Sequence, residues 1–117
     1  MTTTRDICIC VSGGEGLDAP FDPRFGRAAA FLLTDIDGTS VELVPNTGAE
    51  AAHGAGLQAV KLMDAHHVRH VVAGHFGGKA DAGLRAIGAG MWLAPEGLSA
   101  AAVLERFRDH KLARHDG

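Results

Sequence analysis

Five short apolar runs, separated by polar or glycine-rich breaks, predict a sheet of five strands. The first run, ICICV at 7–11, is rich in β-branched residues, which favour strands. The run at 39–44 alternates instead, with Val41 and Leu43 set between polar neighbours, as in a half-buried strand. The predicted strands are 7–11, 31–36, 39–44, 68–73 and 90–94.

Three further segments carry small or apolar residues at helical spacing and predict helices. The stripe of the first segment consists mostly of alanine and glycine, which permits close packing against a sheet. Ser99 is a suitable N-cap for the third helix, and Leu98 and Val103 have the spacing of a hydrophobic staple. The predicted helices are 53–67, 80–87 and 100–110.

The elements follow the order βββαβαβα, which indicates an α/β fold with a mixed five-stranded sheet and helices packed on it. Asp37-Gly38 is a hairpin signal between the second and third strands. Pro20 and Pro23 exclude a helix directly after the first strand. We expect a single domain over residues 1–117, with an ordered core of about 6–112 and the fourth and fifth strands parallel to a central first strand.

In this order the second strand runs opposite to the other four, which brings several irregular segments to one end of the sheet. Ligands of open α/β sheets bind at the carboxyl ends of parallel strands. Several candidate polar side chains fall in these segments, namely Arg24, Arg27, His53, His75 and Lys79. The converging segments are 12–29, 45–53, 74–79 and 94–98.

The charge balance restricts the class of partner. Eleven Lys and Arg against fourteen Asp and Glu give a net charge of −3 and a pI near 6.1, which disfavours general nucleic-acid binding. No apolar run approaches the roughly 18–20 residues of a membrane span, and residues 1–6 lack the apolar core of a secretory signal. We therefore expect a cytoplasmic protein with neither a nucleic acid nor a membrane as partner.

Cys8 and Cys10 are the chain's two cysteines, and they share one face of the first strand. Alternate strand positions lie about 6.5–7 Å apart, a poor geometry for a disulfide. A thiolate pair would suit iron, copper or an iron–sulfur cluster, with Cys10 nearer the converging end. Burial in the core is the competing interpretation, and a central strand favours it.

Two further groups at the converging end suit an anion. Ser12, Gly13 and Gly14 can offer backbone N–H groups to an oxyanion, although the sequence is neither a P-loop nor a dinucleotide-binding motif. Arg24, Arg27 and Lys79 would neutralise an anionic ligand, with ordinary solvated surface charge as the alternative.

Four segments of the chain resemble the dinitrogenase iron-molybdenum cofactor biosynthesis family, which includes NifX, NafY and the C-terminal domain of NifB. They occur in the expected order, and the likeness extends from about residue 7 to 112. It implies a ribonuclease H-like fold and a non-enzymatic carrier of the iron-molybdenum cofactor, its precursor iron–sulfur cluster or another molybdenum-, iron- or copper–sulfur cluster. The segments are LDAP at 17–20, RFGRA at 24–28, AAHGAG at 51–56 and AGHFG at 73–77.

The resemblance also suggests which residues hold the cluster. His53 would be the first metal ligand, His75 a second on a position where the family more often has Asn, and Cys10 a further candidate. Cluster donor and acceptor proteins of nitrogenase-type assembly would be the partners. The expected cofactor-binding set is Ser12, Gly13, Arg24, Arg27, His53, Gly54, His75 and Lys79.

Two other functions compete with the carrier. A regulatory or interaction module of the same family would bind a single metal ion or a small anion. A ribonuclease H-like nuclease would need carboxylates converging on the sheet to hold paired divalent ions, and the first strand offers only Asp6 at its start. The nuclease is the weakest of the three.

Overall fold

The computed structural model describes residues 5–14, 16–48 and 54–115, which form one mixed sheet with helices on both faces. The strand order is β3-β2-β1-β4-β5-β6. The strands are β1 (Ile7–Val11), β2 (Ala30–Thr34), β3 (Val41–Pro45), β4 (His70–Ala73), β5 (Gly90–Leu93) and β6 (Ala113–Arg114). The helices are α1 (Ala55–Ala65), α2 (Gly78–Ala86), α3 (Ala100–Arg108) and a 3₁₀ turn, η1 (Gly16–Asp18).

The apolar strand β1 lies at the centre of the sheet, as predicted. It pairs antiparallel with β2 and parallel with β4, and β4 pairs parallel with β5. All five β1 residues are buried, because each of the two faces of the strand is covered by a layer of the hydrophobic core. Cys8 and Cys10 pack on one side, and Ile7, Ile9 and Val11 pack on the other.

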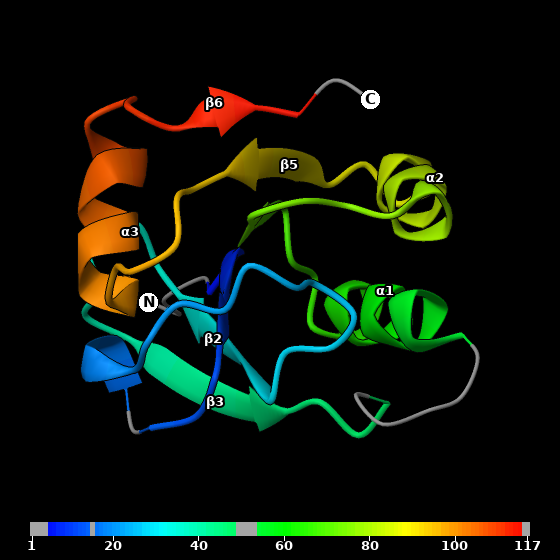
Figure 1. The fold of residues 1–117 in the computed structure, drawn as a ribbon, viewed down its shortest axis with the longest axis horizontal. Helices are drawn as coiled ribbons and strands as arrows, with labels where there is room; N and C mark the ends of the chain where they lie inside the picture. The colour runs from blue at the N-terminus through cyan, green and yellow to red at the C-terminus, as the bar shows by residue number, and fades with distance from the viewer. Residues whose placement is uncertain (1–4, 15, 49–53, 116–117) are drawn as a thin grey trace.

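The sheet separates two hydrophobic layers. Helices α1 and α2 cover the cysteine face, to which they contribute Ala59, Met63 and Leu84, among others. Helix α3 covers the opposite face with Val103 and Leu104, and Figure 1 shows it on the far side of the sheet from α1 and α2. None of the helices in the described ranges combines the length and apolar character needed to cross a membrane.

The prediction of five strands is wrong, because the chain after α3 adds a sixth. His110 adopts a left-handed backbone (φ 58°) that turns the chain back, and β6 then pairs antiparallel with β5. Arg114 places its guanidinium 5.5 Å from the centre of the Trp92 ring. Two residues are too few for a periodic pattern, so the sequence carried no strand signal here. The ribonuclease H-like description of the fold stays a prediction.

Several predicted boundaries also shift at turns. The first helix ends at Ala65 rather than at residue 67 because His67 has φ 57°, and β4 starts at His70 rather than at 68. Helix α2 begins at Gly78, two residues before the predicted start, and ends at Ala86. Helix α3 ends at Arg108 rather than at 110, where the left-handed turn follows.

The hairpin between β2 and β3 is confirmed, but both strands are displaced from the predicted ranges. Strand β2 ends at Thr34 because the carboxylate of Asp35 turns into the loop, where it accepts hydrogen bonds from the Ser40 N–H (3.0 Å) and the Thr39 hydroxyl. Strand β3 therefore starts at Val41 rather than at 39. These hydrogen bonds hold the pKa of Asp35 at about 2.

A close backbone contact joins the loop before β2 to the end of β4. The Gly74 N–H donates to the Pro23 carbonyl at 2.8 Å, and Arg24 and His75 form a parallel bridge next to it. A Cβ atom on Gly74 would overlap the Pro23 side chain and lie 3.1 Å from the Pro23 Cα. Glycine at 74 is therefore a packing requirement.

We expect Gly74→Ala to lower the free energy of unfolding by about 1–3 kcal/mol, because the added methyl group forces the two backbones apart. Gly78→Ala is the matched control. A Cβ there meets no atom within 4 Å, and alanine favours the helix, so stability should stay constant or rise by up to about 1 kcal/mol. Urea unfolding curves of both variants measure the difference, and equal stabilities would contradict the packing argument.

Candidate functional site

A cavity of about 550 Å³ opens where the N-termini of α1 and α2 meet the loop before β2. We call it the two-helix cavity. Each of the three segments contributes at least one glycine, so backbone atoms form much of the cavity wall. The lining residues are Arg24, Phe25, Gly26, Arg27, Gly54, Ala55, Gly56, Leu57, His75, Gly77, Gly78, Lys79 and Ala80.

Both helices begin at the cavity with a glycine in the N-cap position. Gly54 (φ 77°) precedes α1, Gly77 precedes α2, and neither has a side chain to cap the first-turn N–H groups. Helix α3 differs, because Ser99 caps it by accepting from the Ala102 N–H at 3.2 Å. Each helix N-terminus supplies about half a positive elementary charge, so the two together favour an anion in this cavity.

Close glycine contacts bring the three walls together. A Cβ on Gly26 would lie 3.1 Å from the Gly56 nitrogen, so the loop lies almost against the first turn of α1. Gly56 in turn faces Ala80 of α2, at 3.5 Å for a Cβ on Gly56. Larger side chains at these points would separate the helix N-termini from the loop.

Three phenylalanine rings in tilted contact support the cavity around Phe25. Phe25 is buried, and its ring centre lies 5.8 Å from the ring centres of both Phe31 and Phe76. Phe31 belongs to β2, and Phe76 belongs to the β4–α2 loop. These ring contacts therefore hold the loop that carries Arg24 and Arg27 against the loop that carries His75.

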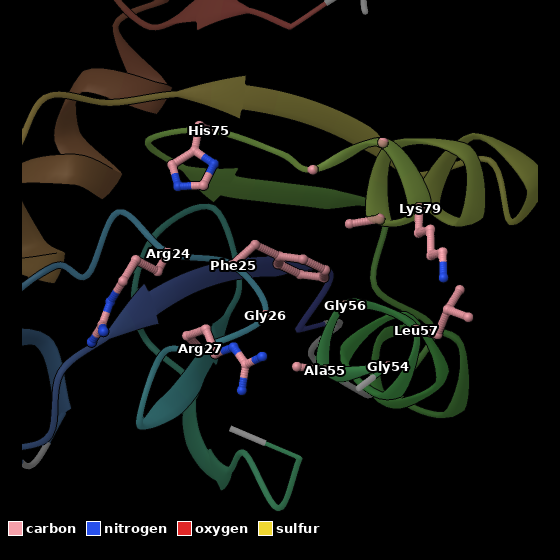
Figure 2. Close-up of a pocket in the computed structure, with 13 residues that line it drawn as sticks. Arg24, Phe25, Gly26, Arg27, Gly54, Ala55, Gly56, Leu57, His75 and Lys79 are labelled. Atoms are coloured by element: carbon pink, nitrogen blue, oxygen red, sulfur yellow. The ribbon is translucent and has the colours of Figure 1, made fainter. Parts of the chain in front are cut away.

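The charged side chains of the lining are all cationic. Arg27 and Lys79 extend from opposite walls, whereas the guanidinium of Arg24 points away from Phe25 (Figure 2). None of the described residues that line the cavity is acidic, although the whole chain carries a net charge of −3. The cavity is thus a locally positive site on a mildly acidic protein.

Asp22 explains the orientation of Arg24. Its carboxylate is buried and accepts from the Arg24 Nε at 3.0 Å, the Arg24 terminal nitrogen at 2.9 Å and the Arg24 backbone N–H at 2.9 Å. The Ser12 hydroxyl donates to the same carboxylate at 3.3 Å. The Arg24 side chain lowers the pKa of Asp22, with smaller contributions from the backbone N–H and Ser12.

A neighbouring cavity of about 630 Å³ shares Arg24 and His75 with the first. Its other walls include Pro23, Gly74 and residues 94–97, where Glu96 is acidic. The bridge between Arg24 and His75 forms the partition between the two cavities. The predicted convergence of 94–98 with the other loops is therefore observed, but at this second cavity.

Five of the predicted site residues meet at the two-helix cavity, namely Arg24, Arg27, Gly54, His75 and Lys79. Ser12 and Gly13 do not line it, because Ser12 is engaged with Asp22 and with the Pro20 carbonyl. His53, the first predicted metal ligand, lies outside the described residues, as does the rest of 49–53.

The structure does not bring Cys10 to the cavity. Cys8 and Cys10 are fully buried in the core between the sheet and the helices α1 and α2, where burial raises the pKa of the Cys8 thiol well above its usual value. Among the described residues, no group of three or more His, Cys, Asp or Glu side chains is arranged to hold a metal ion. The donor set in this part of the chain does not form a closed metal site.

Sequence reasoning missed the parts of the site that act through backbone or burial. Gly77 and Gly78 were assigned to a loop before α2, and their N–H groups belong to a helix N-terminus instead. Asp22 is not among the predicted site residues, yet it is 2% exposed and orients Arg24. The glycine pair directly before an alanine-rich helix was the available signal.

These features define an α/β protein with a cavity lined by cationic side chains and helix N-termini, and comparison with known sequences gives its family. The sequence profile described as dinitrogenase iron-molybdenum cofactor matches residues 5–110, so the chain belongs to that family. The resemblance of the sequence motifs is thereby confirmed. Membership connects the chain with iron-molybdenum cofactor biosynthesis and metallocluster handling.

Solved structures agree with this assignment. The apo form of the orange protein from Desulfovibrio gigas is 31% identical and superposes with a TM-score of 0.90, covering 100% of this chain and 98% of that one. The structure of a candidate NifB protein from Thermotoga is 27% identical with a TM-score of 0.79, covering 95% and 97%. No curated protein matches the chain.

We expect Asp22→Asn to lower the free energy of unfolding by about 1–2 kcal/mol at pH 7, since a buried, hydrogen-bonded carboxylate loses its charge. The folded-state pKa of Asp22 is lowered, so its contribution is present above the ordinary carboxyl pKa and disappears as pH falls through the folded value. The free energies of unfolding of the wild type and the variant should therefore converge as the pH falls below the ordinary carboxyl pKa, and unfolding curves over a series of acidic pH values measure this. Asp37→Asn, in the exposed hairpin turn, is the charge-matched control and should change stability little.

Proposed function

We propose that the chain is a non-enzymatic carrier that binds an iron-molybdenum-type or related metal–sulfur cluster in the two-helix cavity. The observation that carries this proposal is the union of two glycine-capped helix N-termini with Arg27 and Lys79 in one cavity that no described acidic residue lines. A cluster with bridging sulfides is an anion of the size class that such a cavity accepts.

Charge and backbone N–H groups would hold most of the cluster. Exposed sulfides accept hydrogen bonds from the first turns of α1 and α2, and Arg27 and Lys79 balance the remaining charge. Gly77 and Gly78 suit this role because a Cβ at either position would project into open space, which their lack of side chains leaves to the ligand.

Histidine would supply the protein's direct bonds to metal. His75 is exposed at the cavity and offers an imidazole to iron, molybdenum or copper, and His53 is the second proposed ligand from the segment before Gly54. One or two imidazole bonds leave the other metal positions to the ligands that the cluster brings with it. Such a cargo can pass from a donor protein to an acceptor protein of nitrogenase-type assembly by exchange of few ligands.

We expect Arg27→Gln and Lys79→Gln each to weaken cluster binding about tenfold, or about 1.4 kcal/mol, because each removes one charge-assisted contact. Lys61→Gln is the matched control, since Lys61 is exposed on α1 outside the cavity and its loss changes net charge equally. Anaerobic titration with isolated iron-molybdenum cofactor, followed by co-elution on gel filtration, measures the affinities. An equal loss of cofactor affinity in all three variants would mean that the cofactor is attracted by the overall charge of the protein and not by Arg27 and Lys79 in the cavity.

The histidine ligands make a separate spectroscopic prediction. His75→Ala and His53→Ala should alter the electron paramagnetic resonance signal of bound cofactor and reduce its retention. His110→Ala, in the turn after α3 and outside the two-helix cavity, should leave both unchanged. Circular dichroism checks that the variants fold. An unchanged signal in both the His75→Ala and His53→Ala variants would rule out imidazole ligation while leaving electrostatic binding intact.

The same titration separates the carrier from a module for small anions. Molybdate or sulfate is added in place of the cofactor, under identical salt. Saturable binding of these oxyanions with no binding of the cofactor would favour the module, and binding of neither would reject the two-helix cavity as an anion site.

A further inference from the structure

A third cavity, of about 440 Å³, lies at the other end of the sheet from the two-helix cavity. Here the start of β4 and the middle of β5 meet the end of α3. Six of its lining residues matter here, namely Ile36, His70, Trp92, Phe107, Arg108 and Leu112, and none of the described lining residues is acidic. We call it the aromatic cavity. Its volume falls within the range of about 300–1,000 Å³ that is typical of small-molecule sites.

Three rings form a cluster in the wall of this cavity. The ring centres of His70 and Phe107 are 5.2 Å apart, those of Trp92 and Phe107 5.5 Å, and those of His70 and Trp92 6.3 Å. All three side chains are half-buried, and Ile36 beside them is 45% exposed. The rings thus keep apolar surface open to a ligand instead of closing it into the core.

The hydrogen bond between Trp92 and His70 fixes which imidazole nitrogen carries the proton. The indole Nε1–H can only donate, and it donates to the His70 Nδ1 at 3.4 Å. A neutral His70 therefore carries its proton on Nε2, which has no other hydrogen-bond partner among the described residues. The cavity wall thus offers the His70 Nε2–H as a donor beside the guanidinium of Arg108 and the imidazole of His110, and its other lining residues are Ile36, Trp92, Phe107 and Leu112.

Burial favours the neutral form of His70. It is the largest cause of the lowered pKa of His70; the carboxylate of Asp6 acts in the opposite direction, and Arg69 and Arg114 lower the pKa further. Arg114 also covers the Trp92 ring. The remaining cation of the wall is Arg108, exposed at the end of α3.

We propose that the aromatic cavity binds a small aromatic carboxylate. The ring of the ligand packs among Trp92, Phe107 and Ile36, and its carboxylate accepts from the His70 Nε2–H and pairs with Arg108. This inference does not depend on the proposed carrier function, because the two cavities share no residue and lie at opposite ends of the sheet. A carboxylate is preferred over a neutral ligand because the wall offers a donor and a cation and no described acid.

Trp92 is the chain's one tryptophan, so its fluorescence emission reports on this cavity alone. We expect phenylacetate to cause a saturable change in that emission. The neutral isostere phenylacetamide should bind at least tenfold more weakly, and acetate, which lacks the ring, should cause no change. Non-saturable quenching by phenylacetate, or equal affinity for phenylacetamide, would overturn the proposal.

Variants test the two polar contacts separately. His70→Phe keeps a ring but removes the donor, and Arg108→Gln removes the cation. Each should reduce the preference for phenylacetate over phenylacetamide at least fivefold. Arg106→Gln, an exposed neighbour on α3 outside the cavity, is the control and should keep the full preference. Unchanged preference in Arg108→Gln and in folded His70→Phe would overturn the assignment, and Arg108→Gln alone decides if His70→Phe does not fold.

Discussion

The contact between the backbones of Pro23 and Gly74 is the constraint on which the rest of the site depends. Their 2.8 Å hydrogen bond ties a long irregular loop to the end of a central parallel strand, at a separation that admits no side chain at 74. Phe25 follows Pro23 in one loop and Phe76 follows Gly74 in the other, so the contact between their tilted rings extends this junction into the core. The bridge between Arg24 and His75, next to this contact, separates the two adjoining cavities.

The three α-helices begin in two different ways, which differ in whether a side chain caps the first-turn N–H groups. Helix α3 has a serine cap and a hydrophobic stripe, so its N-terminus is satisfied within the protein. Helices α1 and α2 begin with glycine at a cavity. A glycine start leaves backbone N–H groups accessible and gives up the side-chain cap at a cost of only roughly a few tenths of a kcal/mol relative to serine. Local stability is lower where the ligand is expected to bind.

Periodicity predicted the parts of the fold that depend on burial. The apolar run at 7–11 indicated a central strand, and its alternation correctly assigned the two cysteines to one face. Strand β6 escaped prediction because its two residues pair through backbone groups and leave no pattern. The turns that end α1 and α3 early depend on left-handed histidines at 67 and 110, a conformation that is uncommon for histidine and leaves no pattern in the sequence.

The candidate site was predictable to the extent that topology alone brings loops together. Arg27, His75 and Lys79 meet because parallel strands end at one edge of the sheet. The role of Asp22 was not predictable, because only the folded loop buries that carboxylate under Arg24. Segment 94–98 reached the same end of the sheet, but the junction of Pro23 and Gly74 diverts it to the neighbouring cavity.

The burial of Cys8 and Cys10 has a consequence for chemical durability. Both thiols are fully enclosed in the core, and that of Cys8 is held in its protonated form, in which it is neither a good nucleophile nor a metal ligand. With both thiols enclosed, the folded chain can meet thiophilic metals without binding them through cysteine. It can likewise meet oxidants without forming disulfide crosslinks between copies.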